Sequence, residues 1–133
     1  MTREQRWSHL SQLERKFYRN AIERYENILQ VTEDVPTIAI RYNLSIEEVE
    51  RAKNYVIGSG YKYNLVPDVD IAEAWKRLSL GEGNDIDEIF LRHEVLESEL
   101  VVNQGMEQPA AHQIANQQYP WGERLSESRR KYD

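Results

Sequence analysis

Two histidines and two glutamates are the residues of this chain whose types and spacing could do chemistry. His93, Glu94 and Glu97 form an H-E-x-x-E motif, and His112 follows in the segment AAHQIA. Residues four apart share a face of a helix, so His93 and Glu97 should lie together, and His112 could reach them from a helix packed alongside. Two imidazoles and one carboxylate are a three-ligand set suited to zinc or manganese, with a coordination position left for water.

A metal centre is the first of three interpretations. In it Glu94 stands where the zinc-peptidase motif H-E-x-x-H carries its general base, although Glu97 replaces the second histidine of that motif. The second interpretation needs no metal, because a buried Glu–His pair could act as general base and acid. Arg92, Arg77 or Lys62 could then stabilise developing negative charge, which would suit cleavage of a phosphodiester bond in RNA.

The third interpretation is structural. The two histidines and Glu97 could hydrogen-bond one another, or the indole of Trp75, in a polar network that fixes how the helices pack. Each interpretation supplies a partner, because burying an unpaired imidazole or carboxylate costs several kcal/mol. The sequence leaves all three open.

One long helix over residues 85–104 is predicted to position the motif. Asp85 and Glu88 can form a capping box at its start, and Gly105 can adopt the left-handed conformation that ends a helix. On a helical projection His93 lies at the centre of an apolar stripe, and a second apolar line follows the opposite side. We therefore expect a central helix with neighbours on two sides.

His112 is predicted to lie on a helix over residues 109–119. Ala111 and Ala115 share its side of that helix, so His112 should point inward, and the small alanines allow close approach of a neighbouring helix. The polar tail over 122–133 is expected to be flexible.

Residues 35–56 have the pattern of a helix-turn-helix pair, with Ser45 and Glu48 as the capping box of the second helix. A DNA-binding role would need basic or amide side chains early in that helix. It carries instead three acidic ones, which would face the phosphates: Glu47, Glu48 and Glu50. A pair of helices used only for packing is therefore the favoured interpretation.

The remaining segments complete an all-α domain. Residues 2–30 have helical periodicity, and Asp70 with Glu73 can cap another helix. Residues 61–67 are expected to be extended, because a proline disfavours helix at the residue before it. We predict one domain over 1–121, a helical bundle of about five or six helices that includes the helix-turn-helix-like pair.

Composition narrows the class of protein. The 133 residues are 40% hydrophobic and 30% charged, without cysteine, as in a soluble globular domain. No apolar run approaches a membrane span, and no signal peptide is recognisable, so a cytoplasmic location is expected for the isolated chain. The net charge is −6, and residues 31–121 alone carry seven basic and sixteen acidic side chains, a balance of −9. Nonspecific nucleic-acid binding is therefore not expected.

Four segments occur in a distinctive order: TIAIRYNLSIEEVERAKNYV, PDVDIAEAWKRLSLGEG, LRHEVLESEL and AAHQIA with a closing aromatic residue. This order, over about two thirds of the chain, resembles the C-terminal effector domains of bacterial polymorphic toxins and related prophage proteins. The resemblance implies a cognate immunity protein as partner and delivery to a target cell as part of a longer protein. This chain starts at a methionine without a delivery region, so an excised domain or a free-standing relative is expected. The resemblance marks six residues: Trp75, Arg77, His93, Glu94, Glu97 and His112.

The leading expectation is a toxin-like hydrolase, a nuclease acting on RNA rather than a peptidase. Its metal would be held by His93, Glu97 and His112, with Glu94 in catalysis. One alternative is a non-catalytic protein-interaction module that uses the acidic middle and the aromatic-rich ends. A weaker alternative is a DNA-binding regulator that uses residues 36–56. An exposed apolar patch would favour the interaction module, and a positive surface over 45–51 the regulator.

Overall fold

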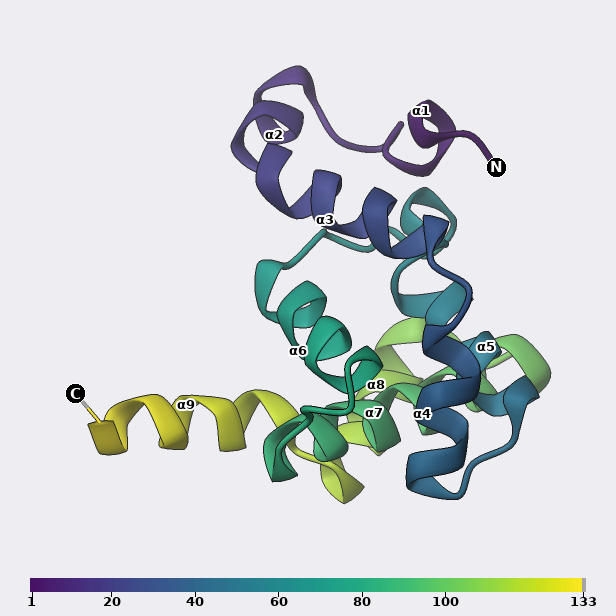
Figure 1. Cartoon of the computed structure of the whole chain (residues 1–133). Coiled ribbons are helices and arrows are strands. Elements are labelled where there is room, and N and C mark those ends of the chain that lie inside the picture. Colours follow the sequence, from purple (N-terminus) through teal and green to yellow (C-terminus); the bar gives the residue numbers. More distant parts are fainter. Residues whose placement is uncertain (133) are drawn as a thin grey trace.

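The computed structural model describes residues 1–132, and every regular element in that range is helical (Figure 1). The all-α prediction is confirmed, but this range contains nine α-helices instead of five or six, because some predicted helices are divided. None of these helices is long and apolar enough to cross a membrane. In chain order the elements are α1 (Arg3–Arg6), α2 (Gln12–Phe17), α3 (Arg19–Gln30), α4 (Asp34–Tyr42), α5 (Ile46–Val56), the 3-10 helix η1 (Gly60–Tyr63), α6 (Val69–Ser79), α7 (Asp85–Ser98), the π-helical segment η2 (Glu99–Asn103), α8 (Gln108–Gln118) and α9 (Trp121–Tyr132).

Helix α7 is the central helix, and it contacts α5, α6, α8 and α9. With its continuation η2 it supplies side chains of the hydrophobic core on both sides: Phe90, Leu91, Leu100 and Val101. Its N-cap lies one residue earlier than predicted. Asn84 and Asp87 bond each other reciprocally in a capping box, so the predicted pairing of Asp85 with Glu88 is wrong. The acidic first turn still complements the positive N-terminal end of the helix dipole.

The end of α7 widens into η2. Gln104 N–H donates to the carbonyl of Glu99, five residues earlier, at 3.2 Å, and Gly105 follows with φ +70°, as its predicted helix-ending role requires. A π-helical turn inserts one extra residue into a helix, and such turns are frequent at functional sites. Here the turn directly follows the H-E-x-x-E motif.

The first thirty residues form three helices where one was expected. Thr2 with Gln5 caps α1 at the start of the chain, a second capping box of Ser11 with Glu14 opens α2, and α3 begins after Tyr18 without a side-chain cap. Side-chain caps satisfy backbone donors that would otherwise continue the helix, so each one favours a new start. Helix α3 then packs against α6.

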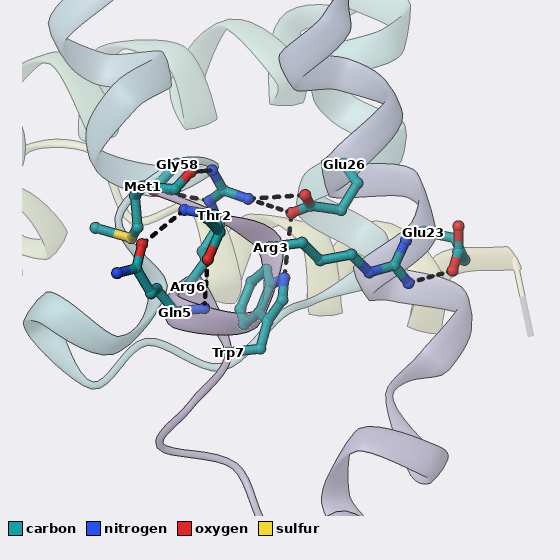
Figure 2. Close-up of polar contacts among 9 residues, drawn as sticks. All are labelled: Met1, Thr2, Arg3, Gln5, Arg6, Trp7, Glu23, Glu26 and Gly58. Carbon is teal, nitrogen blue, oxygen red and sulfur yellow. Dashed lines mark hydrogen bonds and ion pairs between the residues drawn. The ribbon is translucent and has the colours of Figure 1, made fainter.

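A buried arginine holds α1 to the rest of the molecule (Figure 2). The Arg6 guanidinium donates to both carboxylate oxygens of Glu26 on α3, at 2.8 and 2.6 Å. It also donates to the carbonyls of Gly58 and Met1, and the Trp7 indole donates to Glu26 at 3.2 Å. This anchor cluster contains its own cation and anion, and both are bonded on several sides.

Helices α4 and α5 form the helix-turn-helix-like pair. Asn43 makes the turn in the left-handed conformation, with φ 55°, and the capping box of Ser45 and Glu48 is present as predicted. Of the acidic side chains in the first turn of α5, Glu47 is exposed and Glu48 is half-buried. The structure therefore gives this pair a packing role around Ile38, Val49 and the other core residues that it contributes.

Two local expectations are corrected by the structure. The segment 61–67 is not extended throughout, because η1 occupies its first part. Helix α6 is capped by Asp68, whose side chain accepts from the N–H of Asp70, and not by Asp70 with Glu73.

Residues 122–132 of the polar tail belong to helix α9, and Arg129 on this helix pairs with Asp70. The last residue of the tail, 133, lies outside the described residues.

Candidate metal centre

Helices α7 and α8 bring His93, Glu97 and His112 into one cluster. His93 Nε2 lies 3.0 Å, and His112 Nδ1 2.8 Å, from the same oxygen, Glu97 Oε1. One ligand atom of each residue lies within 4.8 Å of the other two. The spacing of four residues aligns the first two on α7, and the fully buried Ala111 and Ala115 let α8 approach closely.

Both ring nitrogens of His93 face acceptors. Nδ1 lies 3.0 Å from the backbone carbonyl oxygen of Tyr119, which can only accept, so Nδ1 carries a proton and donates. Nε2 faces Glu97, and a bare lone pair there would repel the carboxylate oxygen. A proton or a metal ion must therefore lie between Nε2 and Glu97.

Glu97 is surrounded by donors. The Tyr55 hydroxyl, from α5, donates to Oε2, while the two histidines contact Oε1. Burial alone would raise the pKa of Glu97, but the bonds from His93, Tyr55 and His112 bring that pKa below its usual value. Burial, and next the bond to Glu97, raise the pKa of Tyr55, so the phenol stays protonated and remains a donor. Glu97 is therefore a stable anion at neutral pH.

The pKa of His93 shows the same balance. Burial would lower it, but the bond to Glu97, the charge of Glu94 and the carbonyl of Tyr119 together raise it above its usual value. The positive charge that the geometry requires at His93 is therefore favoured by its surroundings. In the absence of a metal ion, a proton on Nε2 supplies that charge.

The donor set fits a divalent transition metal. Ligand atoms of a tetrahedral site with bonds of about 2.0–2.2 Å are roughly 3.3–3.6 Å apart, so the observed separations of 2.8 and 3.0 Å need only small adjustments. Metal-bound histidines commonly donate their other ring N–H to a carbonyl, as His93 does to Tyr119, and bonded carboxylates are commonly supported as Tyr55 supports Glu97. The residue types could hold zinc, manganese or a similar ion, with the two histidine nitrogens drawn together from a separation of at most 4.8 Å.

Glu94 is buried beside this cluster without a partner. Its side chain is buried, with 6% of the residue exposed, and Oε2 has no hydrogen-bond partner. Burial, and next the negative charge of Glu97, raise the pKa of Glu94 to about 8, while His93 opposes the shift. At neutral pH it is mainly a neutral carboxylic acid that can donate a proton.

His112 is where the cluster opens. It was expected to point inward, but its side chain is 49% exposed, while the side chains of His93 and Glu97 are each 4% exposed. The two imidazole rings meet edge to face, with centroids 5.1 Å apart. Solvent, or a ligand from solvent, therefore reaches the cluster from the side of α8.

Two arginines and a tryptophan that the sequence associated with the cluster have other partners. Arg77 makes a two-pronged pair with Asp87, at 2.7 and 2.9 Å, and Arg92 pairs with Glu88 at 2.9 Å. The Trp75 indole donates to Asp34 at 2.9 Å, so its suggested bond to the cluster is wrong. Within residues 1–132 neither arginine bonds to His93, Glu97 or His112.

Two groups of the cluster were not found from the sequence. Tyr55 lies 42 residues before Glu97, on the second helix of the pair for which packing was favoured over DNA binding, and no pattern in the sequence shows what its side chain contacts. The Tyr119 group is a backbone carbonyl, which no residue type identifies.

Comparison of the chain with protein-family models, curated proteins and solved structures finds no match.

Proposed function

We propose that this protein is a divalent-metal-dependent hydrolase and that His93, Glu97 and His112 hold the ion. One observation carries the proposal: His93 Nδ1 is committed to the Tyr119 carbonyl, while Nε2 and His112 Nδ1 converge on Glu97. A buried carboxylate with two imidazole nitrogens aimed at it, open to solvent on one side, is a three-ligand arrangement with a free position. An ion held there would activate a water molecule and polarise the bond to be cleaved.

The residues of the chain have distinct roles in this proposal. Tyr55 and the Tyr119 carbonyl orient Glu97 and His93. Glu94 holds a proton next to the ligands in the free protein, because its pKa is about 8. It is enclosed, so it acts on the charge of the site and not by direct contact with a substrate in this conformation.

A phosphodiester in RNA is the substrate class that we favour over a peptide. A peptidase of the H-E-x-x-H type uses the glutamate of the motif as a water-accessible base, and Glu94 is enclosed here. Arg51 and Arg92 line a cavity of about 340 Å³ that Tyr119 also lines, and cations there would suit a phosphate, although Glu48 and Glu99 line it too and none of the three proposed ligands does. The resemblance to polymorphic-toxin domains supports the same direction, with an immunity protein as partner.

The test is metal content joined to cleavage. The purified chain, reconstituted with zinc or manganese and then freed of excess ion, should retain one equivalent by elemental analysis. His93→Ala and Glu97→Gln should lose that ion, and loss of RNA cleavage by about 100-fold or more should accompany it. His9→Ala removes a histidine elsewhere and should change neither. Absence of bound metal after reconstitution would refute the metal centre, and retained metal without hydrolysis of RNA or peptides would refute the hydrolase.

A protein-interaction module is the second candidate, and one surface favours it. Leu13 and Phe17, one turn apart on α2, are 77% and 80% exposed, and Val66 and Val69 lie beside Phe17 around a shared depression. An apolar surface of this kind is typical of a protein contact. If the chain binds no metal, light scattering on the wild type and on Leu13→Ser/Phe17→Ser would show whether this surface mediates association.

A further inference from the structure

A second site is suggested by a cavity of about 500 Å³ between α3, α4 and α6, formed by residues that the candidate metal centre does not use. Its floor contains buried Ala72 and Trp75, and its walls include Ile28, Val31 and Leu80. Cavities of about 300–1,000 Å³ with a mainly apolar lining and a few polar groups are typical of small-molecule sites.

The polar groups at the floor are already neutralised within the protein. Lys53 Nζ lies 2.8 Å from Asp34 Oδ2, and the Trp75 indole donates to the same oxygen at 2.9 Å. Lys53 also donates to the carbonyl of Val31 at 2.7 Å. The floor therefore offers an apolar, firmly held surface and no uncompensated charge.

The mouth of the cavity offers one cation that forms no ion pair among the described residues. Arg24, Lys76 and Glu33 are its exposed charged side chains. Arg24 pairs with Glu73 at 3.2 Å, whereas Lys76 forms no ion pair among the described residues. Lys76 follows Ala72 by one turn of α6, so its ammonium group can reach over the apolar floor.

We propose that this cavity binds a small apolar molecule that carries one negative charge. The apolar body would cover Ala72 and Trp75, and the anionic group would lie at Lys76, with Arg24 as a second cation. Val31 and Leu80, which are 47% and 60% exposed, would lose water contact on binding. This site is independent of the proposed hydrolase and would remain if the metal centre were refuted.

The probe for the test is 8-anilinonaphthalene-1-sulfonate, an aromatic body with one sulfonate. Titrated into the full chain, it should bind saturably, one molecule per chain, with increased dye emission and reduced tryptophan emission from Trp75. Lys76→Glu replaces the attracting charge with a repelling one and should weaken binding by about tenfold or more. The uncharged N-phenyl-1-naphthylamine should bind more weakly and should not respond to that substitution.

Matched variants locate the dye. Lys16→Glu reverses a charge beside the exposed apolar side chains of α2 and should leave binding unchanged, as should Leu13→Ser/Phe17→Ser. Displacement by 1-naphthoate indicates a planar ligand, and displacement by dodecanoate a long-chain one. The proposal would be overturned if the dye did not bind saturably or if neither acid displaced it. It would also be overturned if binding survived Lys76→Glu but was lost in Leu13→Ser/Phe17→Ser. Circular dichroism of each variant shows that the fold is retained.

Discussion

Two buried ionic clusters of this molecule differ in where their positive charge comes from. In the anchor cluster, the carboxylate of Glu26 is met by the guanidinium of Arg6, and the Trp7 indole and two backbone carbonyls take up further bonds (Figure 2). In the candidate metal centre, Glu97 is met by two histidines, which are positive only when they are protonated. The first cluster contains its own cation, whereas the second is complete only with a proton or a metal ion.

The surroundings of the two clusters differ in the same way. Both partners of the anchor pair are largely enclosed, with side chains 10% and 15% exposed. The candidate metal centre has one enclosed side, with Glu94 unpartnered in it, and one open side at His112. A cluster whose charges are all paired within the protein stabilises the fold. A cluster that needs an ion from outside is suited to bind that ion.

Substitution of Arg6 should have the largest effect on stability. Arg6→Met leaves Glu26 enclosed without its cation, so the free energy of unfolding should fall by about 3–5 kcal/mol. Arg3→Met is the matched control, because Arg3 pairs with Glu23 on the same two helices but both side chains are about half exposed, and the loss should be below about 1 kcal/mol. Urea unfolding of both variants measures the difference. Equal losses would show that enclosure of the anchor does not matter.

The pH dependence of stability should come from the candidate metal centre. The pKa of Glu94 is raised in the folded state to about 8, so its contribution to stability is present at low pH and is lost as the pH rises toward 8. The raised pKa of His93 acts in the same direction, and the lowered pKa of Glu97 matters only on acidification below its unfolded value.

Metal-free protein should therefore unfold more readily at pH 7.5 than at pH 5.5, by roughly 1–3 kcal/mol. Glu94→Met removes the titrating carboxyl group and should abolish most of the difference in unfolding free energy between the two pH values. The variant should be as stable as the wild type, or more stable, at pH 7.5. Urea unfolding at both values of pH tests this. A wild-type protein that is more stable at pH 7.5 would contradict the assigned direction of the Glu94 shift.

Loss of the Tyr55 hydroxyl should have the smallest effect on stability. Tyr55→Phe removes one donor to Glu97 and should cost about 1 kcal/mol without metal. If Tyr55 supports a metal ligand, the same change should weaken zinc binding by about 10–100-fold. Tyr63→Phe, on the ring that packs against Tyr55, is the control and should leave zinc affinity unchanged. Isothermal titration with zinc separates the two roles, because a merely structural tyrosine would alter unfolding alone.

Periodicity was sufficient to predict the elements that carry the cluster. The spacing of His93 and Glu97 placed them on one face, and the alanines around His112 predicted the close approach of α8. Prediction of the helix start failed where two possible capping boxes begin one residue apart. The segment Asn84-Asp85-Ile86-Asp87-Glu88 contains two overlapping capping patterns, and Asp87 of the pattern that forms is also bound by Arg77 from α6.

Contacts between distant segments were beyond the sequence for a physical reason. Arg77 could be proposed for the cluster because a cation is useful there, but its position on α6 matches Asp87, ten residues away. The break at Ser11 was missed because apolar periodicity continues across it, while its capping box interrupts the helix. Periodicity gives the direction of a side chain and not the identity of what it meets.

The bond from His93 to the carbonyl of Tyr119 bears on how this protein can vary over evolution. Every amino acid carries that carbonyl, so position 119 can change its side chain without removing the acceptor that orients His93. Drift at 119 is limited only by the backbone path at the end of α8. The same freedom does not extend to His93, Glu97 or Tyr55, whose side chains make the contacts themselves. Among homologous sequences, the residue type at position 119 would therefore vary, while His93, Glu97 and Tyr55 stayed the same.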